Sequence, residues 1–255
     1  MKNGFMENGF LAEQLVKEFI PGSTLAVIYE TYSSAWELPL VIVKELVESG
    51  WVVPITNYMR PLGHLIRDLN NVGLDAEKSL EHDQLFIIDV FGSRYGLKED
   101  RKNVFYLDSV DPETLNPKIF RIIYEKILPK AKAHGKKVLR LIYPLHGVVQ
   151  IAGEEATIKM LGHHLTQHAT LPVESSMIIS LNKDTVSKNF TSWVVELSDY
   201  VLLSKVFIER NMIEEHLYFL KAPLREFRPG EYLLIKTGRI GKERFGMRRI
   251  GGFSP

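Results

Sequence analysis

The sequence predicts an α/β fold, with a mainly parallel sheet, helices on both faces and antiparallel strands at the C-terminal end. Along most of the chain, short continuous apolar runs alternate with longer segments of helical periodicity. Such runs are typical of parallel strands that are buried on both faces. After about residue 200 the apolar runs follow one another directly, separated by turn-forming or charged residues, which indicates antiparallel pairing.

Apolar residues at helical spacing predict the helices, several of which are followed by glycine. The predicted helices span residues 11–19, 38–49, 62–69, 117–134, 154–170 and 190–197. The apolar runs predict strands at 23–29, 51–56, 84–90, 103–107, 137–143, 175–181, 200–203, 216–220 and 232–235. Pro54 has no amide donor, so the strand that contains it is expected to be weakened or to lie near an edge of the sheet.

Composition excludes several classes of function. The chain has 255 residues, 45% of them hydrophobic, a net charge of +1 and no cysteine. Disulfides, thiolate nucleophiles and cysteine-based metal sites are therefore excluded, and no global charge indicates a nucleic-acid or membrane partner. No apolar stretch approaches the roughly 18–20 residues of a membrane span, and we expect a cytoplasmic protein.

The segment between the first apolar strand and its helix lies where nucleotide-binding α/β proteins have a phosphate-binding loop, G-x-x-x-x-G-K-[ST]. In such a loop the glycines let amides close around phosphate, the lysine reaches the β- and γ-phosphates, and the hydroxyl holds Mg²⁺. Here the segment reads Glu30, Thr31, Tyr32, Ser33, Ser34, Ala35, Trp36, Glu37. No shift of register restores a glycine or the lysine, so an acidic turn without glycine is not expected to wrap its amides around a triphosphate.

Three blocks of sequence resemble the RecA/KaiC-like ATPase superfamily: GSTLAVIYETYSSAWELPLVIVKELVESGWVVPIT, QLFIIDVFGS and WVVELSDYVLLSK. The pattern covers residues 11–221 and is most similar to an archaeal family of uncharacterised KaiC-like proteins that lack a standard Walker A loop. The resemblance implies a RecA-like domain over residues 1–223 and a basic strand and tail over 224–255. It also implies that Asp89 matches the Walker B aspartate, whereas Thr56, Asn57 and Tyr58 stand where KaiC-like enzymes carry catalytic carboxylates.

The acidic side chains of these segments each have two interpretations. Asp89, at a strand end, is either a metal or water ligand or a cap for the loop that follows it at Gly92. Glu30 and Glu37 either work with Asp89 in acid–base chemistry, or Glu37 complements the dipole of the following helix.

The aromatic residues of the loop also have two interpretations. Tyr32 and Trp36 either stack on a base or ribose, or fill an emptied site or form an interface between copies of the chain.

Four histidines, His146, His163, His164 and His168, raise the question of a metal. His164 and His168 are spaced i, i+4, which suits two ligands on one helix face. No third ligand is placed by the sequence, so we expect no metal and interpret these residues as a partly exposed helix face.

The C-terminal segment 224–255 carries eight basic and three acidic residues, a net charge of +5. Its glycines and the aromatic residues Phe245 and Phe253 are typical of a segment that follows a nucleic-acid backbone. The candidate contacts are Arg239, Lys242, Arg244, Arg248 and Arg249. Pairing with an acidic surface of a neighbouring subunit is the alternative.

We therefore expect a non-hydrolysing RecA/KaiC-like binding or scaffold protein with no cofactor, which assembles as a homo-oligomer as RecA-like domains commonly do. Two alternatives stay open. One is an active ATPase with an unusual loop, and the other is a nucleic-acid-associated module that works through the basic C-terminal segment.

Overall fold

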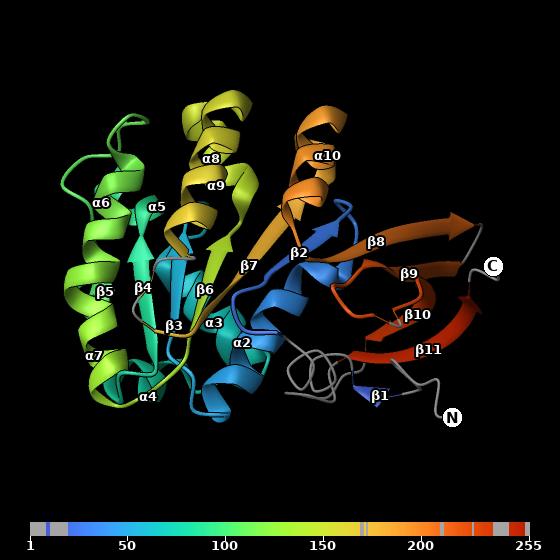
Figure 1. Cartoon of the computed structure of the whole chain (residues 1–255), viewed down its shortest axis with the longest axis horizontal. Helices are drawn as coiled ribbons and strands as arrows, with labels where there is room; N and C mark the ends of the chain where they lie inside the picture. The colour runs from blue at the N-terminus through green and yellow to red at the C-terminus, as the bar shows by residue number, and fades with distance from the viewer. Residues whose placement is uncertain are drawn as a thin grey trace.

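A computed structural model describes residues 9–10, 20–168, 171, 173–209, 212–225, 227–236 and 245–252 of the chain. Its strands form one sheet of eleven, in the order β1-β11-β10-β9-β8-β2-β7-β6-β3-β4-β5. Helices lie on both faces of the parallel part, and the antiparallel strands extend the sheet to one side (Figure 1). The predicted fold class is confirmed.

The parallel part of the sheet contains the apolar runs that alternate with helices. In the order of the sheet, the strands from β8 through β2, β7, β6, β3 and β4 to β5 all run parallel to one another. These strands are β2 (Thr24–Tyr29), β3 (Val53–Asn57), β4 (Leu85–Asp89), β5 (Val104–Phe105), β6 (Val138–Tyr143), β7 (Ser175–Asn182) and β8 (Tyr200–Glu209).

The antiparallel part begins where β8 turns back into β9, and each later strand pairs antiparallel with the one before it. The short strand β1 then pairs antiparallel with β11, so the first and the last described strands lie side by side at one edge of the sheet. These strands are β9 (Met212–Lys221), β10 (Gly230–Lys236), β11 (Phe245–Gly252) and β1 (Gly9–Phe10).

Two apolar cores lie on opposite faces of the sheet. The first packs strand side chains against α2 (Leu38–Glu48), α3 (Leu62–Asn71) and α4 (Ala76–Glu81), and it continues into β9, β10 and β11. The second packs the other face against the remaining helices (Figure 1). They are α5 (Val90–Tyr95), α6 (Leu115–Ile122), α7 (Leu128–Ala133), α8 (Leu145–Ala152), α9 (Glu154–His168) and α10 (Lys188–Leu197).

Several elements differ from their prediction. Pro54 lies in β3, which is flanked by β6 and β4, so of the two alternatives, a weakened strand or one near an edge, the second is wrong. A gap in the β3–β6 pairing accommodates the missing amide. The two segments pair at Val52, and the pairing resumes at Ile55. The helix predicted over 117–134 consists of α6, a π-helical segment η2 (Ile123–Ile127) and α7.

Other elements were not predicted at all. The helices α4, α5 and α8 are short, and too few residues define their periodicity. The helix predicted over 11–19 lies outside the described residues. Within the described part of the chain, no helix is long and apolar enough to cross a membrane.

The antiparallel strands share the first core with the parallel ones, so we expect both parts to unfold together. Phe219 on β9 is 1% exposed, and its ring lies 6.4 Å from that of Tyr200 on β8. Phe219→Ala is expected to lower the free energy of unfolding by about 3–5 kcal/mol in one cooperative urea transition. Phe207→Ala, at a ring that is 42% exposed on β8, should cost less than about 1 kcal/mol. Two separate transitions would contradict this prediction.

Candidate functional site

The turn after β2 leads into a continuous helical stretch. A short 3₁₀-helix, η1 (Ser34–Glu37), passes directly into α2. Ser33 caps it, because its Oγ accepts a hydrogen bond of 2.9 Å from the backbone amide of Ala35. The first amides of a helical stretch have no acceptor within the helix. They therefore need a partner from elsewhere.

That partner is the carboxylate of Glu215, which comes from β9. One oxygen accepts hydrogen bonds from the amide of Ser34 at 3.0 Å and from its hydroxyl at 2.5 Å. The other oxygen accepts from the amide of Ala35 at 3.1 Å, from the hydroxyl of Ser204 on β8 at 2.8 Å, and from the hydroxyl of Ser33. We call this carboxylate with its partners Ser33, Ser34, Ala35 and Ser204 the Glu215 site.

The Glu215 site is an anion-binding arrangement that the chain fills with its own carboxylate. Two backbone amides and three hydroxyls converge on one negative charge at the amino end of a helical stretch, where the helix dipole favours an anion. From the sequence, the amides of this turn are not expected to close around a phosphate group. In the structure, the amides of Ser34 and Ala35 do point at an anion, and that anion is the side chain of Glu215.

A second contact joins the loop to the antiparallel strands. Lys236 at the end of β10 places its Nζ 2.6 Å from Oε1 of Glu37. The Glu37 residue is 4% exposed, so this charge pair is partly shielded from water. The side chain of Glu37 makes no capping hydrogen bond to α2. The predicted role of Glu37, a charge that complements the helix dipole, is therefore incomplete, because its carboxylate also pairs with Lys236.

The start of the loop is tied to β7 and β8. Glu30 accepts a hydrogen bond of 2.8 Å from the amide of Val206, and its other oxygen lies 3.0 Å from Nζ of Lys183. The amide of Thr31 donates to Asp184, which follows β7, at 2.8 Å. Glu30 therefore has structural partners on both oxygens.

The two aromatic residues of the loop have different surroundings. Trp36 packs against the first core, and the guanidinium of Arg60 lies 4.8 Å from its ring centroid. Tyr32 is 81% exposed. The interpretation that both rings fill an emptied site is thus wrong for Tyr32, which projects into solvent, and Trp36 is the only one of the two that packs against the core.

Asp89 ends β4 and caps α5. Its Oδ1 accepts hydrogen bonds from the amide of Gly92 at 3.0 Å and from the side chain of Asn57 at 2.8 Å, so the capping interpretation is confirmed. Burial raises the pKa of this carboxyl above its usual range, although both hydrogen bonds act against the shift. Oδ2 has no hydrogen-bond partner among the described residues.

The strand order separates Asp89 from the loop. Three strands, β7, β6 and β3, lie between β2 and β4. At about 4.8 Å a step, four steps place these strands roughly 19 Å apart. The hypothesis that Glu30, Glu37 and Asp89 act together is therefore wrong. Between β2 and β4, the first two strands are β7, which ends in Asn182, and β6, which ends in Tyr143. Neither residue carries a carboxylate.

The four histidines lie on two helices, His146 on α8 and the other three on α9. Among the described residues, no group of three His, Asp or Glu side chains could hold a metal ion. His164 is 1% exposed and contacts Arg140, so the expectation of a partly exposed face is wrong for this residue. His146 on α8 is buried as well, and burial lowers its pKa to about 4.

The basic C-terminal residues lie partly outside the described chain. Arg239, Lys242 and Arg244 fall there. Arg248 and Arg249 lie on β11 and are exposed. Phe245, on the same strand, is 1% exposed and belongs to the first core, so it is not an aromatic platform for a base.

Glu215, Ser204 and Lys236 were missed by the sequence analysis. A weak signal was present, because side chains alternate along a strand and Glu215 shares its face of β9 with the buried residues Leu217 and Phe219. An acid on the buried face of a strand needs a partner. Nothing in the sequence identified that partner as a loop some 180 residues earlier.

Comparison with known proteins supports the fold. No protein-family model matches the chain, and no curated protein matches it. Similar solved structures include an uncharacterised protein from Pyrococcus horikoshii in complex with an unknown peptide, with a TM-score of 0.79, 21% identity, and coverage of 96% of this chain and 100% of that one. A KaiC-like protein of Pyrococcus horikoshii matches with a TM-score of 0.66 and 13% identity, over 91% of this chain and 92% of that one. The chain therefore has a RecA/KaiC-like fold.

The Glu215 site predicts a measurable loss of stability. Glu215→Ala removes the acceptor of two amides and three hydroxyls, and we expect it to lower the free energy of unfolding by about 1–3 kcal/mol in urea titrations. Glu209→Ala is the matched control, because Glu209 is an exposed acid at the end of β8 in the same pair of strands. Equal stability of Glu215→Ala and the wild type would show that the carboxylate does not hold the loop.

Proposed function

We propose that this chain is a non-hydrolysing RecA/KaiC-like protein that serves as a binding or scaffold module. The proposal rests on the Glu215 site. In the RecA/KaiC-like fold, the turn after β2 corresponds to the loop that would hold a nucleotide's phosphates. In this chain the amides of Ser34 and Ala35 bind a carboxylate of the chain itself.

A phosphate group would meet two obstacles at this loop. It would have to displace the Glu215 carboxylate from five donors, and it would then lie near a second acid, Glu37. The loop offers no lysine to compensate, because Trp36 stands at that position. Lys236, at the end of β10, lies next to the loop and is paired with Glu37. The negative charge of Glu37 and the occupation of the amides by Glu215 therefore both oppose the binding of a triphosphate.

The groups that would catalyse hydrolysis are also replaced. β7, which pairs with β2, ends in the amide side chain of Asn182, and β6, the next strand beyond it, ends in the phenol of Tyr143. β3 ends in Asn57, whose amide nitrogen donates to Asp89 and to the carbonyl of Arg60. An amide in this position neither activates water as a base nor holds Mg²⁺ as a carboxylate does. The fold is thus proposed to serve binding rather than turnover.

A polypeptide is the partner class that we propose. A structure of similar fold, from Pyrococcus horikoshii, was determined with an unknown peptide bound. An α/β scaffold without a nucleotide retains the edges of its sheet as surfaces that can bind other chains.

Calorimetric titration with ATP and Mg²⁺ tests the proposal. We expect no binding tighter than about 100 µM by the wild type and no release of phosphate. Glu215→Ala frees the amide of Ser34 and leaves the amide of Ala35 bonded only to the Ser33 hydroxyl, so the variant is expected to bind inorganic tripolyphosphate at least about tenfold more tightly than the wild type, still without hydrolysis.

Glu209→Ala serves as the control in the same titrations and should behave as the wild type does. Binding of Mg²⁺–ATP by the wild type at affinities tighter than about 100 µM would refute the proposal and favour an active nucleotide site. Unchanged tripolyphosphate binding by Glu215→Ala would show that Glu215 is not what excludes phosphate from the loop.

A further inference from the structure

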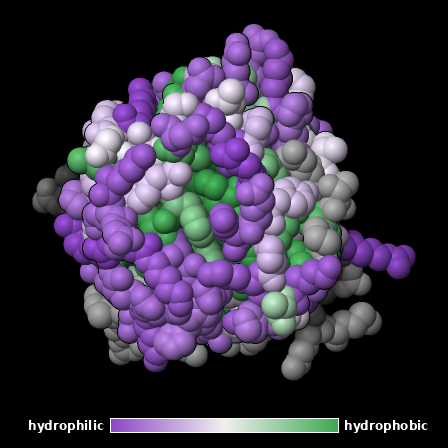
Figure 2. All heavy atoms as spheres, turned by 90° about the vertical axis from the view of Figure 1, so that its left-hand side faces the viewer, coloured by the Kyte–Doolittle hydropathy of each residue, from purple (hydrophilic) through white to green (hydrophobic). Residues whose placement is uncertain are grey.

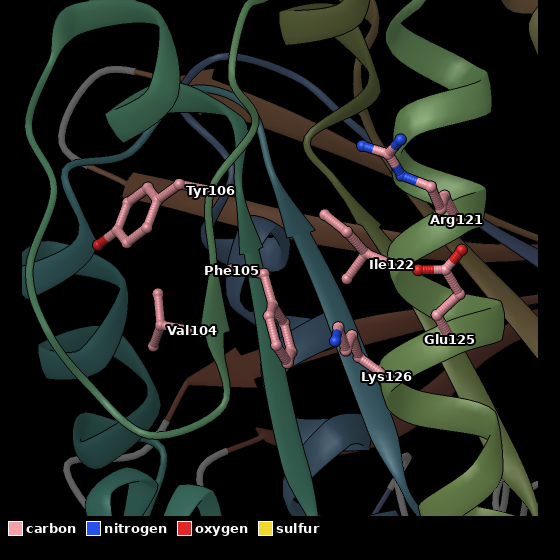
Figure 3. Close-up of a pocket in the computed structure, with 7 residues that line it drawn as sticks. All are labelled: Val104, Phe105, Tyr106, Arg121, Ile122, Glu125 and Lys126. Atoms are coloured by element: carbon pink, nitrogen blue, oxygen red, sulfur yellow. The ribbon is translucent and has the colours of Figure 1, made fainter.

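A cavity lies at the free edge of the parallel sheet, beside β5. It has a volume of about 510 Å³ and opens to solvent between β5 and the helical segments α6 and η2. Figure 3 shows its lining: Val104, Phe105, Tyr106, Arg121, Ile122, Glu125 and Lys126. β5 forms one side of the parallel part of the sheet, and β8 and β2, next to the Glu215 site, form the other side, so the two sites are separate.

The floor of the cavity is apolar. The side chains of Phe105 from β5 and Ile122 from α6 lie on its inner side, and both are half-buried against the second core (Figure 3). The ring of Phe105 stacks on that of Phe86, with centroids 6.5 Å apart, which fixes its position. Figure 2 shows a hollowed apolar patch on this side of the molecule, surrounded by hydrophilic residues. An apolar patch with a polar rim is typical of an interaction site.

The backbone at this edge has free hydrogen-bonding groups. β5 pairs only with β4 among the described strands. The amide of Ile87 on β4 donates to the carbonyl of Asn103 at 2.9 Å. Residues of a parallel strand face alternate neighbours, so Asn103 and Phe105 face β4, and the carbonyl of Val104 and the amide of Tyr106 face outward. Among the described residues no hydrogen bond involves the backbone amide of Tyr106. The hydroxyl of Tyr106 accepts from the amide of Glu99, which holds the segment in place.

The rim of the cavity carries two cations without ion pairs. Arg121 and Lys126 are exposed, and neither forms a salt bridge within the described part of the chain. The one acid at the rim, Glu125, is likewise unpaired there. The rim is therefore positive by one charge, which favours a partner that carries a carboxylate.

We infer that the β5 edge binds an extended polypeptide segment of a partner protein, as an added strand. The inference rests on the proposed binding role. The outward groups of Val104 and Tyr106 would bond to the main chain of the segment, and an apolar side chain would enter the cavity over Phe105 and Ile122. Side chains two residues apart lie on the same face of a strand, so an acidic residue two positions further along meets Arg121 or Lys126.

The probe for this site is a labelled eight-residue peptide in which threonine occupies every second position and the other positions alternate between valine and aspartate. Fluorescence anisotropy with the full chain is expected to show saturable binding with Kd below about 1 mM. Arg121→Glu with Lys126→Glu should weaken binding at least about tenfold. The matched control is Lys132→Glu with Lys188→Glu, two exposed lysines on α7 and α10, and it should leave Kd unchanged.

The main-chain part of the inference has its own probe. Two further versions of the peptide retain every side chain. One is methylated on the backbone nitrogens of its odd-numbered residues and the other on those of its even-numbered residues. One of them should bind at least about tenfold more weakly, because a strand-facing donor is lost. Absence of saturable binding, equal binding of all three peptides, or unchanged binding by the Arg121/Lys126 variant would overturn the inference. None of these outcomes touches the nucleotide titration, so failure here is distinguishable from failure of the proposed function.

Discussion

The contact between the Glu215 carboxylate and the start of η1 joins the two parts of this sheet. The amides of Ser34 and Ala35 belong to the parallel, helix-flanked part, and Glu215 belongs to the antiparallel strands. Unsatisfied amides and a half-buried carboxylate would each be costly alone, and together they satisfy one another. Lys236 adds a second link from the antiparallel strands to Glu37. The conformation of the loop therefore depends on the strands that follow it by some 170–200 residues.

Much of the architecture follows from patterns that are local in sequence. β2, β4, β6 and β7 are continuous apolar runs, and each strand is found within two residues of its predicted bounds. The absence of glycine and lysine after β2 is also a local fact, and it predicts a loop that departs from the phosphate-binding pattern. What the local pattern could not give is the anion that the amides bind, because Glu215 is distant in sequence.

The remaining differences have the same physical origin. Strand order arises from packing of the whole chain, so the sequence alone could not show that three strands separate Asp89 from the loop. Because Pro54 lacks one donor, it predicts a strand that is weakened or lies near an edge. β3 is flanked on both sides, and a gap in one ladder accommodates the missing donor. The π-helical segment η2 within the predicted long helix and the free edge at β5 likewise emerge only from three-dimensional packing.

A crystal structure of the chain grown with a non-hydrolysable ATP analogue and Mg²⁺ tests the central claim most directly. The account predicts that the Glu215 carboxylate stays within hydrogen-bond distance of the amides of Ser34 and Ala35, with no phosphate between residues 30 and 37. Electron density for a triphosphate held by those amides, with the Glu215 side chain turned away, would contradict it.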